Sequence, residues 1–236
     1  MTMLLVSGVL AADLRIAAAA NLNQVLPELI SSFEKESPDI RTSVTYAASG
    51  TLVQQISMGA PYELFLSASS KYVDFLDGRK LVLARQDFAR GRLVLYYSKF
   101  IRPPPAAVSD LTRADIGRVI IANPLHAPYG SAAISCLQFY HVLDEVRPKL
   151  VYATNVSQAA QMSVRGAATA FIALPFAKNP ELMRSGGIVM LPDECYPPLI
   201  QEAALLRPVE AGREFLAFLA SDKARSILER YGYDPP

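Results

Sequence analysis

Four short segments place small or neutral hydrogen-bonding residues directly after strand-like sequence and before helix-like sequence. They surround Asn21, Ser49, Tyr129 and Val156. A turn that leads from a strand into a helix leaves several backbone N–H groups unpaired, and the helix dipole adds partial positive charge there. Such turns are typical anion sites. None of the four contains Lys or Arg, so the sequence predicts an anion site built from neutral donors.

The side chains in these turns add further donors. Ser49 offers a hydroxyl, and Gly50 after it allows close approach to the backbone. Asn21 and Asn155 are each expected to cap the helix that follows. Any one of these turns by itself is most simply a helix cap, but together they indicate a shared ligand. Neutral N–H and O–H groups can hold a dehydrated oxyanion without burial of a counter-ion.

Catalytic motifs are missing from the sequence. It contains no GxSxG, no Walker lysine motif and no GxGxxG after a strand. His126 and His141 are the only histidines. His126 is near the Tyr129 turn, but no motif places a nucleophile or carboxylate beside it, so we expect a loop or lobe-interface residue. The protein is therefore predicted not to be an enzyme. The alternative, an α/β enzyme for a phosphorylated or sulfated substrate, would need a general base near the four turns.

Strand-like and helix-like segments alternate along the chain. The expected strands are 13–18, 42–47, 64–67, 93–97, 119–122, 150–152, 170–173, 188–191 and 199–206. This alternation predicts an α/β fold with mostly parallel sheets. Ligands of such sheets bind beyond the carboxyl ends of the strands, which is where all four turns are expected.

Composition limits the function classes further. The chain has 236 residues, of which 51% are hydrophobic, enough for one α/β domain or two lobes. Its net charge of +1 gives no basic footprint, so no nucleic-acid partner is expected. The two cysteines, Cys136 and Cys195, fit no zinc pattern. They could pair in an oxidising compartment or remain buried thiols, and the sequence leaves both open.

The N-terminus carries an apolar run at 3–10 followed by Ala11 and Ala12. The run is shorter than the roughly 20 residues that cross a bilayer. It is typical of the apolar region and small-residue cleavage site of a secretory signal. We therefore expect residues 1–12 to be the remnant of a secretory signal peptide. The alternative is an ordinary first strand or a cloning remnant.

Several stretches resemble the periplasmic molybdate-binding proteins of ABC importers. They are AAAANLNQVLPEL, YAASGTLVQQISMGAPYELFLSAS, IANPLHAPYGSAA, NVSQAAQMSVRGAATAFIAL and YGYDP, which follow in matching order from Asp13 onward. The resemblance implies a two-lobed periplasmic-binding-protein fold, with mostly parallel sheets flanked by helices and a crossover hinge near 93–98 and 199–206. It implies that lobe 1 is 13–96 plus 203–236 and that lobe 2 is 97–202.

The same resemblance implies the function and the contacts. The protein would bind molybdate or tungstate in the cleft between the lobes and present it to an ABC permease in the inner membrane. It would be a periplasmic monomer without a cofactor. The implied ligand contacts, which reach the metal only through the oxygens of the oxyanion, are Ala20, Asn21, Ser49, Gly50, Tyr129 and Val156, the last through its backbone.

One residue departs from the family pattern. Members usually have a hydroxyl residue either at the position of Asn21 or at the position before it. This chain has Ala20 followed by Asn21, so neither position carries a hydroxyl. Asn21 can donate through its amide instead. The alternative is that the same scaffold binds another oxyanion or a small organic molecule.

Overall fold

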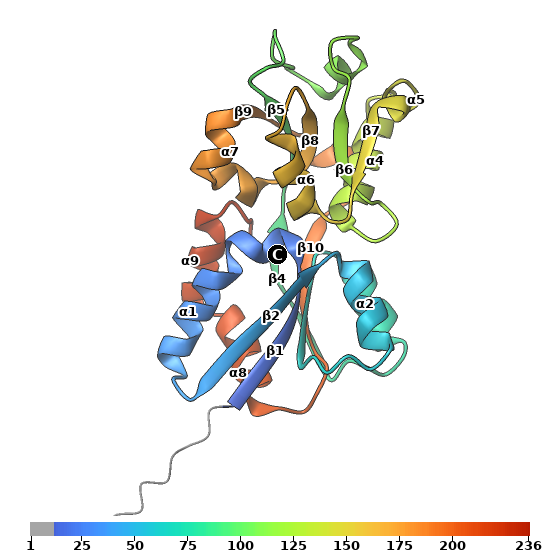
Figure 1. The fold of residues 1–236 in the computed structure, drawn as a ribbon. Coiled ribbons are helices and arrows are strands. Elements are labelled where there is room, and N and C mark those ends of the chain that lie inside the picture. Colours follow the sequence, from blue (N-terminus) through green and yellow to red (C-terminus); the bar gives the residue numbers. More distant parts are fainter. Residues whose placement is uncertain (1–11) are drawn as a thin grey trace, which may run out of the picture.

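The computed structural model of the chain describes residues 12–236, so the expected signal remnant at 1–12 lies outside them except for Ala12, which begins the first strand. Two five-stranded sheets form the framework, one below the other in Figure 1, in the orders β2-β1-β3-β10-β4 and β7-β6-β8-β5-β9. We call the part of the chain built on the first sheet lobe 1 and the part built on the second lobe 2. The strands are β1 Ala12–Ala19, β2 Ile40–Ala47, β3 Leu64–Ser67, β4 Ala84–Gly91, β5 Leu93–Ser98, β6 Val119–Ala122, β7 Leu150–Ala153, β8 Thr169–Ala173, β9 Gly186–Met190 and β10 Leu199–Leu205.

Both sheets have the same pattern of strand directions. In the first, β1 pairs in parallel with β2 and β3, and β10 runs antiparallel between β3 and β4. In the second, β6 pairs in parallel with β7 and β8, and β5 runs antiparallel between β8 and β9. One strand in each sheet therefore opposes the others, and the predicted α/β class with mostly parallel sheets is confirmed.

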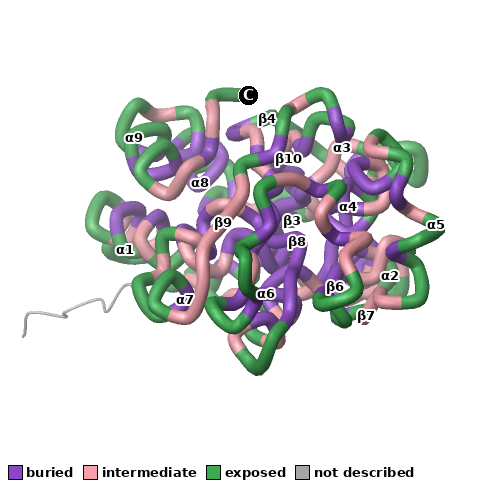
Figure 2. The backbone as a smooth tube through the Cα atoms, turned by 90° about the horizontal axis from the view of Figure 1, so that it is seen from above, coloured by how far each residue is buried: buried purple, intermediate pink, exposed green. Residues whose placement is uncertain are grey.

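Helices cover both sheets. They are α1 Leu26–Glu36, α2 Ser49–Ser57, α3 Ser70–Asp77, α4 Pro128–Phe139, α5 Leu143–Val146, α6 Val156–Ser163, α7 Pro180–Ser185, α8 Glu210–Leu219 and α9 Asp222–Arg230. Side chains of β1 alternate between the two faces of its sheet. Leu14 and Ile16 belong to the apolar cluster with α1, α8 and α9. Ala17 belongs to the cluster with α2 and α3. The buried strands lie inside a shell of exposed helix faces and loops (Figure 2).

The chain passes from one sheet to the other at two points. β4 ends at Gly91 in the first sheet, and β5 begins at Leu93 in the second. The return precedes Leu199, because β10 pairs only within the first sheet. The expected lobe boundaries at 96 and 203 therefore fall inside strands. The apolar strand β5 begins directly after the first crossing, with no loop between them. The sequence pattern therefore gave no sign of the boundary between the lobes.

Two local expectations were wrong. β4 was not expected, because its sequence ARQDFARG is mostly polar, and its exposed and buried residues alternate only in part. Asn21 was expected to cap a helix. It lies instead inside a short 3-10 helix, Ala20–Gln24, which precedes α1 and has no side-chain cap. The Pro at the start of α1 suits a first helical turn, where its missing N–H costs nothing.

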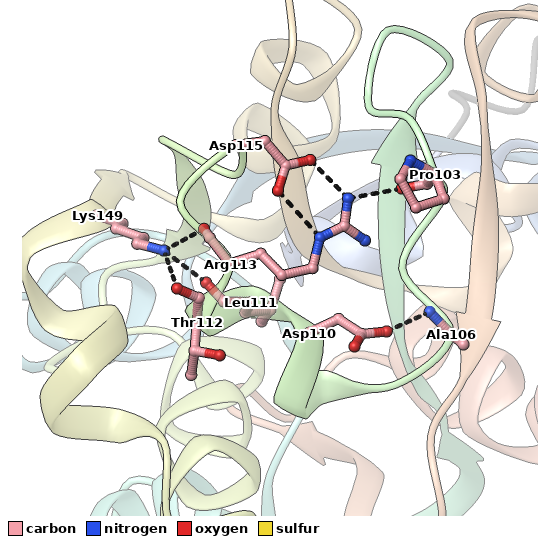
Figure 3. Close-up of polar contacts among 8 residues, drawn as sticks. All are labelled: Pro103, Ala106, Asp110, Leu111, Thr112, Arg113, Asp115 and Lys149. Atoms are coloured by element: carbon pink, nitrogen blue, oxygen red, sulfur yellow. Dashed lines mark hydrogen bonds and ion pairs between the residues drawn. The ribbon is translucent and has the colours of Figure 1, made fainter.

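A side-chain network anchors the long connection between β5 and β6 at the outer end of lobe 2 (Figure 3). Lys149 Nζ donates to the carbonyl oxygens of Leu111, Thr112 and Arg113 at 2.7–2.9 Å. These carbonyls end a 3-10 helix, Val108–Thr112, where a cation offsets the partial negative charge. Arg113 pairs with Asp115 and donates to the carbonyl of Pro103. The connection is thus fixed well away from the space between the lobes.

Cys136 and Cys195 form a disulfide, which resolves the open question of their pairing. It joins α4 to the segment that precedes the second crossing between the lobes. Among residues 12–236, no helix is both long enough and apolar enough to span a bilayer.

Candidate functional site

Strand register places the turns of each sheet side by side at its carboxyl edge. In lobe 1 the last residues of β1 and β2, Ala19 and Ala47, are direct partners. In lobe 2 the last residues of β6 and β7, Ala122 and Ala153, are direct partners as well. Because each pair of parallel strands ends together, the two turns that follow it start side by side. The carboxyl edges of the two sheets face each other across the space between the lobes (Figure 1).

A small cavity lies where the turns meet. It is lined by Ala19, Ala20, Asn21, Ala48, Ser49, Ala68, Ala127, Pro128, Tyr129, Asn155 and Val156. Five of the six expected contacts line it, and they come from both lobes. Only about 10 Å³ is open to the centre of a water-sized sphere, about the room that one water molecule needs. The cavity is therefore too small for an extended ligand.

Helix starts supply donors to this cavity. The 3-10 helix begins at Ala20, α2 at Ser49, α4 at Pro128 and α6 at Val156. The first N–H groups of a helix have no partner within it. Five of the eleven lining residues are alanines, whose small side chains leave the backbone open to a ligand at close range. Asn155 Oδ1 accepts a hydrogen bond from the Gln158 N–H at 3.0 Å, which confirms the expected cap of α6. This bond does not use the earlier N–H groups of the same turn, so they remain available to a ligand.

Ser49 is fully buried, and its hydroxyl is already held in place. The Ala68 N–H donates to Ser49 Oγ at 3.1 Å. A hydroxyl has one hydrogen to donate, and this contact uses only an acceptor position. The Ser49 O–H thus remains able to donate to an acceptor in the cavity. Ala68 also lines the cavity but was not among the expected contacts. It directly follows the buried strand β3, and this position after a strand end could have indicated its place in the site.

The side-chain amide of Asn21 was expected to cap a helix or to donate to the ligand, but it forms hydrogen bonds within the protein. Its Nδ2 donates to Gln201 Oε1 at 2.7 Å and to the Tyr233 hydroxyl at 3.0 Å. The Tyr233 hydroxyl in turn donates to the Asn21 carbonyl at 2.9 Å. Both amide hydrogens are therefore engaged within the protein, and they fasten the first turn to β10 and the C-terminal segment. What Asn21 can offer to a ligand is its backbone N–H.

Tyr129 carries a buried hydroxyl with no hydrogen-bond partner among the described residues. The residue is 2% exposed. Its hydroxyl lies against Gly91, where an added Cβ would come within 2.2 Å, so only glycine fits at that crossing. Burial, with a smaller effect of Tyr233, raises the pKa of Tyr129 well above its usual range. The phenol is therefore a neutral donor at physiological pH and carries no charge that would repel an anion.

Gly50 lies outside the cavity. Its N–H donates to the carbonyl of His126 at 2.9 Å, so this residue joins lobe 1 to lobe 2. The contact also places His126 at the interface of the lobes, as the sequence suggested. A second hydrogen bond between the lobes, from Asn23 Nδ2 to Ser157 Oγ at 2.7 Å, was not foreseen. Two hydrogen bonds between the lobes thus flank the cavity.

No charged side chain of residues 12–236 lines the cavity. Among the described residues, no group of three or more His, Cys, Asp or Glu is arranged to hold a metal ion. The electrostatic attraction for an anion comes from the helix starts of α2, α4 and α6, whose positive ends point to one place. A buried anion would be held by neutral donors alone.

The model of the family described as "Bacterial extracellular solute-binding protein" matches residues 14–234. The chain belongs to this family. Among family relatives, the molybdate-binding protein ModA of Rhodobacter capsulatus is 33% identical, over 94% of this chain and 88% of its own. ModA of Azotobacter vinelandii is 30% identical, over 94% of this chain and 90% of its own.

Solved structures give the same picture of this extracellular solute-binding protein. The periplasmic molybdate-binding protein of Azotobacter vinelandii superposes with a TM-score of 0.86 at 28% identity, over 94% of this chain and 99% of that chain. The fold is therefore that of the periplasmic binding proteins. The sulfate-binding protein SubI of Mycobacterium tuberculosis, with a TM-score of 0.77 at 16% identity over 95% of this chain and 87% of that chain, shares the fold alone.

Proposed function

We propose that the chain is the periplasmic solute-binding component of an ABC importer and that it binds molybdate or tungstate in the cavity between its lobes. One observation carries the proposal: four turns from two sheets meet at one small cavity without a charged side chain. The ligand contacts are the backbone N–H groups of Ala20, Asn21 and Val156 with the hydroxyls of Ser49 and Tyr129. The names and identities of the molybdate-binding relatives support the choice of ligand.

Cavity size supports a compact oxyanion over a small organic molecule. Carbon chains and rings need more room than the cavity offers, whereas four oxygens bound to one atom have their centres close together. Sulfate and phosphate offer similar acceptors. Molybdate and tungstate have longer bonds from the central atom to oxygen, so discrimination follows from how far apart the donors stand.

The binding cycle is a hinged closure. We propose that the lobes, divided at Arg92 and before Leu199, move as units about the two crossings and close on the ligand. The free energy of ligand binding then favours the closed form, and the permease responds to that form. The protein acts as a monomer without a cofactor or a nucleic-acid partner and performs no chemistry, since no general base lines the cavity.

Export to the periplasm agrees with two observations. Solute-binding proteins of this family are extracellular, and disulfides such as Cys136–Cys195 persist in oxidising compartments. A secretory signal in residues 1–12 would provide the route.

The direct test is thermal unfolding of ligand-free protein with molybdate, tungstate, sulfate or phosphate at about 1 mM each. A ligand at about a thousand times its Kd stabilises the folded state by about 4 kcal/mol, a shift of several degrees. Molybdate and tungstate are expected to raise the Tm, with little or no effect of the other two.

Stabilisation by sulfate or phosphate alone would assign the site to another oxyanion. No response to any of the four would leave an organic ligand as the better candidate. Calorimetric titration with molybdate gives the stoichiometry, for which one site per chain is expected.

A further inference from the structure

A second, larger hollow lies beside the cavity, on the outer side of the contact between Gly50 and His126. Its volume is about 550 Å³. Lobe 1 contributes α2 and α3 with residues that include Met58, Lys71 and Phe75, and lobe 2 contributes Leu125 and His126 from the turn before α4. In Figure 1 this turn descends toward the upper end of α2. We call this hollow the interlobe groove.

The groove has an unusually apolar and exposed rim. Met58 and Leu125 expose 80% and 78% of their surface, and Phe75 exposes 46%. Single exposed apolar residues are ordinary, but a gathered set around a hollow is typical of a surface that contacts another molecule. Two of these three side chains come from lobe 1 and one from lobe 2. Opening of the lobes would separate Leu125 from Met58 and Phe75.

The charge of the groove has one sign. Lys71 and Arg79 line it, and no carboxylate from the described part of the chain does. Neither cation makes an ion pair within residues 12–236. The guanidinium of Arg79 instead lies over the Phe75 ring, 4.2 Å from its centroid. Cations without partners beside exposed apolar side chains favour a partner that combines an apolar side chain with a carboxylate.

The hydrogen bond between Gly50 and His126 forms the inner wall of the groove. An added Cβ on Gly50 would lie 3.0 Å from the Cα and the carbonyl oxygen of His126 and from the Tyr72 hydroxyl. The two lobes therefore meet here without spare room, and the wall exists only while they are together. A partner seated in the groove contacts both lobes at the point where closure brings them together.

We propose that the interlobe groove is the docking site for a periplasmic segment of the permease that bears an acidic residue next to an apolar one. The groove is assembled only in the closed arrangement, so its occupant distinguishes loaded protein from open protein. This inference rests on the proposed function, because it takes an ABC permease as the partner.

The test uses the molybdate importer of the source organism in lipid nanodiscs and measures its ATPase rate against the concentration of molybdate-loaded protein. Two double variants probe the groove. Met58→Ser combined with Leu125→Ser removes apolar side chains from the rim, and Lys71→Glu combined with Arg79→Glu reverses the charge of the groove. Each is expected to raise the concentration for half-maximal stimulation by about tenfold or more, as truncation of important interface residues does. Molybdate affinity, measured by calorimetry, is expected to stay within about twofold. These residues neither line the cavity nor form the two hydrogen bonds that join the lobes beside it.

Matched controls lie outside the groove. Phe100→Ser removes an apolar side chain that is 64% exposed, and Arg184→Glu reverses an exposed charge on α7 of lobe 2. Both are expected to stimulate the ATPase as the unchanged protein does. Equal stimulation by the groove variants and the controls would overturn the docking site, as would loaded wild-type protein that leaves the ATPase at its basal rate. Loss of molybdate binding by the wild-type protein would instead refute the proposed function, so the two failures are distinguishable.

Discussion

At the scale of single residues, the buried hydroxyl of Tyr129 is the proposed ligand contact that gives the sharpest test. It has no partner among the described residues, and a buried polar group without a hydrogen bond costs about 1–3 kcal/mol. Ligand binding can remove this cost if an acceptor enters the cavity. The raised pKa keeps the hydroxyl protonated, so it can donate throughout the physiological pH range.

Tyr129→Phe is therefore expected to have opposite effects on stability and on binding. The Tm of ligand-free protein should stay level or rise, because an unpaired buried hydroxyl is removed. The Kd for molybdate should rise about tenfold or more, since a hydrogen bond to a charged group is worth about 1.5–3 kcal/mol. Calorimetry and thermal unfolding on the same sample test both. An unchanged Kd would remove this hydroxyl from the ligand contacts.

Ser49→Ala is expected to weaken molybdate binding by at least about tenfold for the same reason. It also takes the partner from the Ala68 N–H, so a modest loss of Tm is expected. Ser163→Ala is the matched control, because Ser163 is fully buried as well but bonds to the Ala160 carbonyl inside α6. Its Kd should equal that of the unchanged protein. Equal effects of the two variants would mean that Ser49 acts only through the fold.

Ala20→Ser tests the departure from the family pattern. The added hydroxyl reaches a cavity of neutral donors, so molybdate affinity should stay equal or improve. Titration calorimetry measures the change. A large loss would show that the alanine makes room for a different ligand.

At the scale of elements, the site depends on how α2 of lobe 1 meets the turn before α4 of lobe 2. Gly50, the first residue after Ser49 in α2, has no Cβ, and this lets its N–H reach His126. The residue was expected to contact the ligand. The structure gives it a different role, in which it lets the lobes approach each other.

Gly50→Ala is expected to act as a wedge between the lobes. The new Cβ meets His126 at 3.0 Å only when the lobes are together. Overpacking of this kind costs about 1–3 kcal/mol, so the Kd for molybdate should rise about tenfold. Gly117→Ala, with nothing within 4 Å of the added atom, is the control. A Kd unaffected by Gly50→Ala would show that binding does not require this approach.

At the scale of the whole molecule, the proposed binding cycle links ligand binding to lobe closure. The hydrogen bonds from Gly50 to His126 and from Asn23 to Ser157 join the lobes on either side of the cavity without being expected to touch the ligand. They favour the closed form whether or not ligand is bound. Affinity therefore includes a contribution from residues outside the cavity.

Asn23→Ala should weaken molybdate binding severalfold, because one hydrogen bond worth about 0.5–1.5 kcal/mol is lost from the closed form only. Small-angle X-ray scattering should show a larger radius of gyration for the ligand-free variant than for the unchanged protein. Saturating molybdate should bring both to the same smaller value. Identical ligand-free scattering and identical affinity would show that this bond does not influence closure.

The alternation of strands and helices could be predicted from the sequence alone, and so could the four turns that surround the cavity. Short-range properties carry that information: strand runs, helix-start residues and small side chains at the ends of strands. The turns that these properties marked, at Asn21, Ser49, Tyr129 and Val156, all line the cavity. That they contact a ligand stays a prediction. Asn155 also caps its helix as expected, since a cap depends only on residues within one turn.

Contacts between groups that are distant in the sequence could not be predicted, because they depend on how the whole chain packs. The Asn21 amide is engaged by Gln201 and Tyr233, about two hundred residues away along the chain, so no local pattern could show that it was occupied. The role of Gly50 likewise depends on His126 of the other lobe. Local sequence fixes which groups can bind an anion. The packing of two lobes decides which of those groups remain available and which hold the lobes together.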